Sequence, residues 1–274
     1  IRAMSLETIL SFFILMLISI GTYFVSRRIR VPYTVLLVLV GSLLVPLTHV
    51  EFFAFLKAFR LTPELLFYLF LPILIFESAY NMRVRDLMQN VRAVSWFSVG
   101  SLVISMFFIA VVLFFVLGLV GMEVPFMATL LFGALISATD PVAVLALFKE
   151  FGVPRRLAFL FEGESLFNDG TSLAAFLVVL EIILAGFSGV STVLEGLFTF
   201  STMVFGGIAF GILMGFLFAK LIERVEDNEH IEITLTMLVA HLTFILSEVL
   251  SHHLVIGGME IKFSAIIATV MASM

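Results

Sequence analysis

Two stretches decide the fold of this chain, Ser137-Ala138-Thr139-Asp140-Pro141 and Glu164-Ser165-Leu166-Phe167-Asn168-Asp169-Gly170. Both lie inside long apolar runs, so they place three carboxylates within segments of membrane-spanning length. Inserting an acid at the centre of a membrane helix costs about 3 kcal/mol. Acids retained at such a cost indicate a functional site within the membrane.

The composition is that of a membrane protein. Of the 274 residues, 62% are hydrophobic and 13% are charged, and the mean hydropathy is +1.22. A soluble domain of this length does not bury so much apolar surface, whereas lipid solvates it. The lack of cysteine excludes disulfides and thiolate metal sites. The net charge of −5, with no basic patch among aromatic residues, argues against a nucleic-acid partner.

Apolar runs separated by short polar breaks predict an all-α, polytopic membrane fold of about nine transmembrane helices, since about 20 residues cross a bilayer. We expect these helices near residues 6–26, 32–49, 62–80, 93–119, 124–148, 157–186, 196–222, 231–250 and 255–274. Residues 52–61 are an alternative, a short interfacial helix between the second and third spans. Because the last run stops in apolar sequence, we expect the chain to be the N-terminal portion of a longer protein.

The basic residues predict the orientation. With the N-terminus external and every span crossing, most of the 15 Lys and Arg residues fall on the cytoplasmic side. These are Arg27, Arg28, Arg30, Arg83, Arg85, Arg92, Lys149, Arg155, Arg156, Lys220 and Arg224. Such asymmetry is the positive-inside pattern. It predicts a multi-pass protein of the cell (inner or plasma) membrane, in contact with lipid, with an external N-terminus.

The fifth and sixth spans should form an antiparallel hairpin that turns near Pro154. Asp140 precedes this proline by 14 residues and Asp169 follows it by 15, so at about 1.5 Å per residue both acids lie at the same depth. Pro141 lacks an amide donor and clashes with the preceding turn, which should interrupt the helix at 139–141 and free carbonyl oxygens. Irregular backbone at membrane depth is tolerated where protein buries it or a wet cavity meets it.

The sixth span should present a polar stripe. Ser165, Asn168, Asp169 and Ser172 fall within an arc of about 100° on a helix. Their oxygen and amide groups suit a hard cation better than a softer metal. Glu164 lies at the edge of the stripe, where it would orient the site or pair with a base rather than bind the ion.

Two further features accompany these residues. Gly207, Gly211 and Gly215 form a small-residue ridge on the seventh span, which favours close helix packing or a subunit contact. Lys262 would extend its ammonium toward the membrane surface or pair with a segment beyond Met274.

The motifs resemble those of the monovalent cation/proton antiporter family, in its prokaryotic sodium/proton exchanger branch. The resemblance extends over the whole chain and is strongest at residues 71–77 (LPILIFE), 138–142 (ATDPV) and 161–170 (FEGESLFNDG). It implies one half of an inverted-repeat fold, with crossed interrupted helices in a mobile core and a scaffold that forms a homodimer.

The resemblance also implies roles for individual residues. Asp140 and Asp169 would bind Na⁺ or H⁺, Thr139 and Ser165 would add oxygen ligands to the Na⁺ site, and Glu164, Asn168 and Pro141 would support them. Asparagine at 168, in place of a second aspartate, implies electroneutral exchange. No cofactor is expected beyond the transported Na⁺ and H⁺. The expected domains are scaffold helices over 1–92, ion-binding core helices over 93–186, and linking, scaffold-type helices over 187–274, truncated before the second core repeat.

The predicted function is therefore exchange of a monovalent cation, Na⁺ ahead of K⁺ or Li⁺, for protons, through competition for buried carboxylates. No enzymatic activity is expected. An intramembrane aspartyl protease also needs two acids at one depth, but its Gly-x-Gly-Asp type of motif is absent. A non-transporting assembly or ion-sensing module with the same fold is a further alternative, which ion-dependent thermal stabilisation without flux would favour.

Overall fold

The apolar runs fold as helices, since a helix satisfies its backbone hydrogen bonds internally where no water is available. A computed structural model describes residues 6–29, 31–225, 228–256 and 259–274. In these ranges, six helical segments are long and apolar enough to cross a membrane. They are Leu6–Ile29, Pro63–Tyr80, Val84–Leu119, Arg155–Ala185, Val190–Ile222 and Glu229–His253. The all-helical membrane fold is confirmed, and the count of nine spans stays a prediction.

The chain divides into two units, residues 1–66 and 67–274. The first contains α1 (Leu6–Ile29), α2 (Tyr33–Leu47), the 3₁₀ helix η1 (Glu51–Ala58) and α3 (Pro63–Leu65). The fully buried Ser11 hydroxyl lies 2.6 Å from the carbonyl oxygens of both Glu7 and Phe55, which fastens η1 to α1. The short helix suggested between the second and third spans is therefore present as η1. The functional domain boundaries remain predictions.

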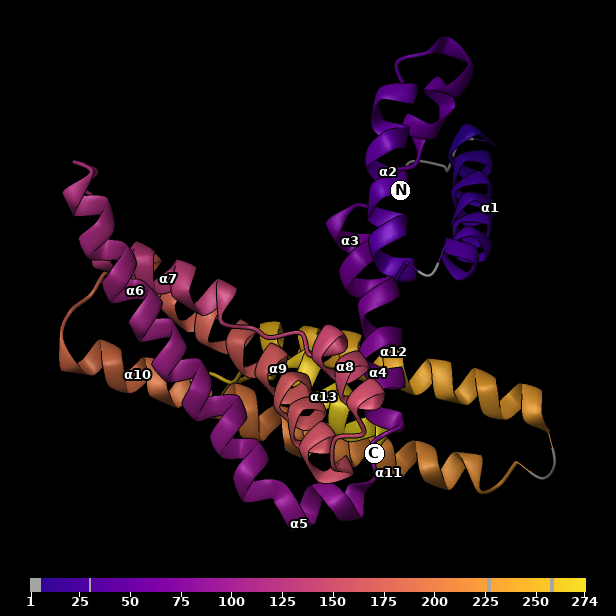
Figure 1. Ribbon diagram of the computed structural model, residues 1–274. Helices are drawn as coiled ribbons and strands as arrows, with labels where there is room; N and C mark the ends of the chain where they lie inside the picture. The colour runs from indigo at the N-terminus through magenta and orange to yellow at the C-terminus, as the bar shows by residue number, and fades with distance from the viewer. Residues whose placement is uncertain (1–5, 30, 226–227, 257–258) are drawn as a thin grey trace. The chain divides into compact units, whose positions relative to one another are not determined.

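The second unit contains most of the helices (Figure 1). From residue 66 onward the helical segments are η2 (Leu66–Phe70), α4 (Leu71–Tyr80), α5 (Val84–Ser95), η3 (Trp96–Gly100), α6 (Ser101–Leu119), α7 (Phe126–Ile136), α8 (Val142–Phe151), α9 (Arg155–Ala185), α10 (Val190–Ser201), η4 (Thr202–Gly206), α11 (Gly207–Ile222), α12 (Glu229–His253) and α13 (Ala265–Ser273). The segments η2, η3 and η4 are π-helical turns that join consecutive α-helices.

The predicted single helix over 255–274 is wrong. Val255–Ile256 (β1) and Met259–Glu260 (β2) pair as antiparallel strands, and only α13 is helical beyond them. The helix lies inside the protein, since Ile267, Ala268 and Val270 are fully buried.

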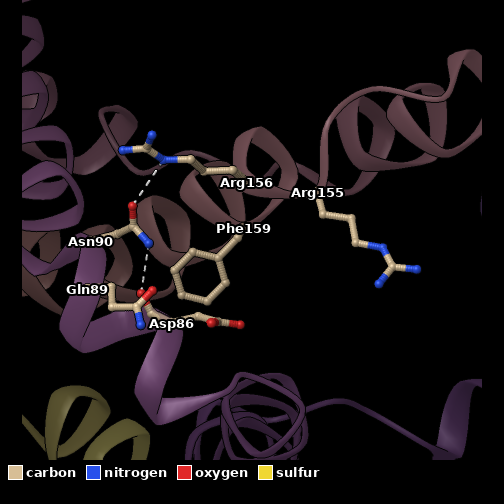
Figure 2. A pocket seen from close by; sticks show the side chains of 6 residues that line it. All are labelled: Asp86, Gln89, Asn90, Arg155, Arg156 and Phe159. Atoms are coloured by element: carbon tan, nitrogen blue, oxygen red, sulfur yellow. Dashed lines mark hydrogen bonds between the residues drawn. The ribbon is translucent and has the colours of Figure 1, made fainter.

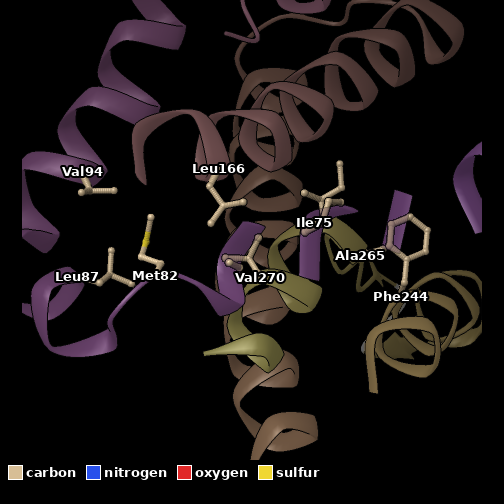
Figure 3. Close-up of a cluster of buried hydrophobic side chains, with 10 residues drawn as sticks. Ile75, Met82, Leu87, Val94, Leu166, Phe244, Ala265 and Val270 are labelled. Atoms are coloured by element: carbon tan, nitrogen blue, oxygen red, sulfur yellow. The ribbon is translucent and has the colours of Figure 1, made fainter. Parts of the chain in front are cut away.

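Close packing around α13 forms the core of this unit. The helix packs against α4, α9, α11 and α12. Its apolar side chains join residues of four other helices in the cluster of Figure 3. That cluster includes Ile75, Met82, Leu87, Val94, Leu166, Phe244, Ala265 and Val270.

The glycine ridge of α11 faces α13. A Cβ atom at Gly207 would lie 2.9 Å from the carbonyl oxygen of Ser264, and one at Gly215 would lie 3.0 Å from that of Ala272. A Cβ at Gly211 would overlap the carbonyl oxygen of Ala268. Of the two expectations for the ridge, the structure shows close helix packing within the chain.

Candidate functional site

The predicted fifth span is interrupted where Pro141 stands. Helix α7 ends at Ile136, α8 begins at Val142, and residues 137–141 form a turn and irregular backbone between them. Proline cannot donate a backbone hydrogen bond, so the helix cannot continue across it unchanged. The ends of two helices therefore meet here, with carbonyl groups that lack helical partners.

Helix α9 supplies donors to these carbonyl groups. Ser165 Oγ donates to the carbonyl oxygen of Thr139 at 2.5 Å, and Asn168 Nδ2 donates to that of Ser137 at 3.2 Å. One turn further along, Ser172 Oγ donates to the carbonyl oxygen of Ala134 at 2.7 Å. Three members of the predicted polar stripe thus bind the interrupted helix, and all three are buried.

Glu164 accepts hydrogen bonds from both sides of this contact. Thr139 Oγ1 lies 3.1 Å from each carboxylate oxygen of Glu164 and donates its single hydrogen between them. Asn168 Nδ2 lies 3.0 Å from Glu164 Oε1 and 3.3 Å from Thr139 Oγ1. No basic residue of the described ranges forms an ion pair with Glu164. The carboxylate therefore fixes Thr139 and Asn168 relative to each other.

Asp140 and Asp169 stand beside this network. Asp140 interacts electrostatically with Asp169, and so does Glu164. Both aspartates are exposed, and Thr139 is exposed with them. Exposure at the protein surface does not test burial within a membrane, so the burial of these carboxylates stays a prediction. Within the polar stripe Ser165, Asn168 and Ser172 are buried, whereas Asp169 is exposed.

Asn168 is the most buried polar residue of the site. Its side chain is fully buried, and its Oδ1 atom has no hydrogen-bond partner among the described residues. Its Nδ2 atom lies near three acceptors, although an amide nitrogen carries two hydrogens. The neutral amide of Asn168 donates to Glu164 through Nδ2, and its own Oδ1 accepts no hydrogen bond from the described residues.

Several contributing residues were not predicted from the sequence. Ser137 Oγ donates to the carbonyl oxygen of Gly133 at 2.6 Å and to Ser105 Oγ at 3.2 Å, so α6 also holds the end of α7. Thr171 Oγ1, one turn beyond Phe167, lies 3.4 Å from the carbonyl oxygen of Ser98 in η3. Isolated Ser and Thr residues in apolar helices most often bond to their own preceding turn, so sequence offers little signal for such contacts.

Among the described residues, no group of three or more His, Asp or Glu side chains is arranged to hold a metal ion. The candidate ion ligands are instead two carboxylates, Asp140 and Asp169, with hydroxyl oxygens of Thr139 and Ser165 nearby. Lys262 lies elsewhere, on the segment after β2, where it pairs with Glu181 of α9 and with Glu260 at 3.5 Å. Lys262 thus pairs within the chain, which neither expectation for it had named.

Comparisons with a family model and with known proteins agree on one family. The sequence model of the family described as "Sodium/hydrogen exchanger, transmembrane" matches residues 14–259. The Na⁺/H⁺ antiporter ApNhaP of Aphanothece halophytica is 37% identical over 257 residues, covering 92% of this chain and 46% of the relative. The low-affinity Na⁺/H⁺ antiporter NhaS1 of Synechocystis is 36% identical over 252 residues, covering 90% and 45%. The chain spans about half the length of these curated relatives.

A solved structure shares the fold. The sodium proton antiporter MjNhaP1 of Methanocaldococcus jannaschii, determined at pH 8, superposes with a TM-score of 0.69. The match covers 98% of this chain and 61% of that one, at 20% sequence identity.

Proposed function

Since the chain belongs to the sodium/hydrogen exchanger family, we propose that it takes part in the exchange of Na⁺ for H⁺ across a membrane. The observation that carries this proposal is the contact between the interrupted helix α7–α8 and the polar face of α9, with Asp140 and Asp169 beside it. Interrupted helices near the membrane midplane are where secondary transporters bind their ions.

The mechanism we propose is competition for the two aspartates. Two carboxylates close enough to interact repel each other when both are ionised, so binding of a proton or of Na⁺ relieves the repulsion. Na⁺ prefers oxygen ligands, as other hard cations do, and the hydroxyls of Thr139 and Ser165 lie at the same break. A site that holds one ligand at a time couples the two fluxes as it opens to alternate faces.

Glu164 has a different role in this proposal. Its oxygens already accept hydrogen bonds from Thr139 and Asn168, so it orients the break and does not act as an ion ligand. Asn168 is neutral at the position next to Asp169. Because an asparagine stands at 168 in place of a second aspartate, we propose that exchange is electroneutral, one H⁺ for each Na⁺.

The wider arrangement is part of the same proposal. We place the ion-binding core over 93–186, dimer-forming scaffold helices over 1–92, and linking, scaffold-type helices over 187–274. The clustering of basic residues on alternate loops supports an external N-terminus in a cell membrane. Lipid surrounds the protein, and a homodimer is the expected assembly.

Transport by a variant at Asp169 tests the assignment. The protein is expressed from its complete gene and reconstituted in proteoliposomes, and sodium-driven proton movement is followed with a pH-sensitive dye. Asp169→Asn should abolish exchange. Glu195→Gln, which neutralises an exposed acid on α10, should transport like the unmodified protein. Exchange in Asp169→Asn at the control rate would refute the role of this carboxylate.

Electroneutrality has its own test in the same vesicles. A potassium gradient with valinomycin imposes a membrane potential without adding sodium or protons. One-for-one exchange moves no net charge, so the initial rate should not change with the sign of this potential. A rate that rises with one polarity and falls with the other would overturn the proposed stoichiometry.

A further inference from the structure

A second polar site lies away from the interrupted helix. A cavity of about 470 Å³ opens where the start of α9 meets α5, and Figure 2 shows the side chains around it. The lining residues are Asp86, Gln89, Asn90, Arg155, Arg156 and Phe159. Five of the six are charged or carry an amide, which distinguishes this cavity from the apolar grooves that lipid chains fill.

One arginine of the cavity is held in place. Arg156 Nε donates to Asn90 Oδ1 at 3.2 Å, and Asn90 Nδ2 donates to the carbonyl oxygen of Asp86 at 2.9 Å. Figure 2 shows Arg156 reaching toward α5 through this pair of bonds. The other guanidinium N–H groups of Arg156 remain available to donate hydrogen bonds. Arg155 extends from the same end of α9 in another direction.

Positive charge around the cavity is not balanced. Among the lining residues that the structure describes, Asp86 is the single acid, against two arginines. Neither Arg155 nor Arg156 forms an ion pair within the described ranges. Arg85 and Arg92 of α5 add charge and are likewise unpaired there. Guanidinium groups with unused donors match the oxygens of a phosphate, which they bind through paired hydrogen bonds.

The lengths of the two helical segments around the cavity are consistent with its lying at the level of the lipid headgroups. The segment Val84–Leu119 has 36 residues and Arg155–Ala185 has 31, so at about 1.5 Å per residue both exceed the roughly 30 Å hydrocarbon core. Their excess length must extend beyond the hydrocarbon. In Val84–Leu119 the charged and amide residues lie at the start, up to Arg92, and apolar residues follow. Arg155–Ala185 begins with its two arginines, which the apolar run 157–161 follows. The Phe159 ring is the apolar side chain among the described lining residues.

We propose that this cavity binds the phosphate group of an anionic phospholipid, with Arg155 and Arg156 as its principal contacts and Asn90 and Gln89 as amide donors. The bound headgroup would join the start of α9 to α5. Because α9 also carries Asp169, the lipid would restrain the helix on which the candidate ion site stands. Basic cavities between membrane helices recognise acidic headgroups in this way.

Lipid binding by paired variants tests the proposal. The protein, expressed from its complete gene and purified in detergent, is titrated with phosphatidylglycerol, and bound lipid is counted by native mass spectrometry. Arg155→Gln with Arg156→Gln should raise the half-saturating lipid concentration tenfold or more, since each interfacial basic residue contributes about a factor of five. The matched control is Arg27→Gln with Arg28→Gln, two adjacent arginines at the end of α1. It should bind lipid like the unmodified protein.

Two further arms separate the remaining outcomes. Phosphatidylcholine with the same acyl chains should not saturate the site, and excess inorganic phosphate should not displace phosphatidylglycerol. Displacement by inorganic phosphate would overturn the lipid assignment in favour of a soluble anion. An equal loss of lipid binding in the two paired variants would refute the assignment of the lipid to this cavity. If the Arg155/Arg156 variant fails to fold, Asn90→Ala releases Arg156 without removing a charge. It should weaken binding severalfold, and unchanged binding would refute the proposal.

Discussion

Adding one methyl group at Gly211 should destabilise the protein although alanine is the better helix former. A Cβ at this position would overlap the carbonyl oxygen of Ala268, and it would lie 2.7 Å from Met271 Cβ. The obstructing atoms are backbone and Cβ atoms, which no rotamer change can move. Helices α11 and α13 must therefore separate, and this loosens the packing around Ile267, which is fully buried.

The magnitude follows from two opposed contributions. Overpacking in a well-filled core costs about 1 to 3 kcal/mol, and a clash with rigid backbone belongs at the upper end. Replacing glycine by alanine within a helix returns about 1 kcal/mol. We therefore expect Gly211→Ala to lower the free energy of unfolding by about 2 kcal/mol. Gly118→Ala in α6 is the matched control, because no atom lies within 4 Å of the Cβ it would add. It should leave stability unchanged or raise it by up to about 1 kcal/mol.

Thermal unfolding in detergent, followed by far-UV circular dichroism at one scan rate, measures the difference. The two variants are expected to differ by about 2 to 3 kcal/mol, which corresponds to roughly 4 to 12 °C in Tm at this chain length. The reasoning would be refuted if Gly211→Ala melted at the same temperature as Gly118→Ala, since the close approach of α11 and α13 would then be absent from the folded protein.

Three other substitutions follow from contacts of single residues. Thr139→Val removes the hydroxyl that bridges Glu164 and Asn168. It should raise the sodium concentration for half-maximal exchange about tenfold, since a hydrogen bond to a charged group contributes about 1.5 kcal/mol. Thr139→Ser keeps the hydroxyl and should leave this concentration unchanged. Asn168→Asp places a carboxylate where an amide nitrogen now lies 3.0 Å from Glu164 Oε1, so the variant should melt earlier near pH 8 and recover toward pH 5, where the two acids share a proton. An equal deficit at both pH values would contradict this. Lys262→Glu places a second negative charge beside Glu181 and should lower the free energy of unfolding by about 1 kcal/mol. Adding the substitution Glu181→Lys should restore this stability. A double variant no more stable than the single one would argue against the ion pair.

The interruption of the fifth span was predictable because its cause is local. Pro141 acts through its own covalent structure, so the break could be placed within a few residues from the sequence alone. The polar stripe of α9 was predictable for a similar reason, since helical periodicity fixes which residues share a face. Ser165, Asn168 and Ser172 accordingly meet the same neighbouring helix.

The error over 255–274 came from weighing hydropathy above turn chemistry. The sequence Val255-Ile256-Gly257-Gly258-Met259-Glu260 places two glycines between short apolar strands, a pattern typical of a two-residue hairpin. The observed register pairs Val255 with Glu260 and Ile256 with Met259. The early start of the fourth span at Val84 was missed for the opposite reason, since Arg85, Asp86 and Arg92 suggested a loop.

Exposure of Asp140 and Asp169 could not be predicted from depth arithmetic. Counting residues from Pro154 places two acids at one level, but it does not determine which atoms cover them. Helical geometry puts Asp169 100° from Asn168, and that rotation separates a fully buried amide from an exposed carboxylate. Whether a residue of α9 is buried depends on the helices that pack against it. Neither the helical period nor the hydropathy of α9 predicts this.

The three acids differ in their surroundings, and that difference constrains what each can do. Glu164 is surrounded by donors from Thr139 and Asn168, so a cation that replaced them would have to break at least two charge-assisted hydrogen bonds. Asp140 and Asp169 face outward and repel each other, so a cation between them would remove an unfavourable interaction. In the proposed mechanism the cation therefore binds at the aspartates and not at Glu164, whose hydrogen bonds keep Thr139, the residue before Asp140, in a fixed position.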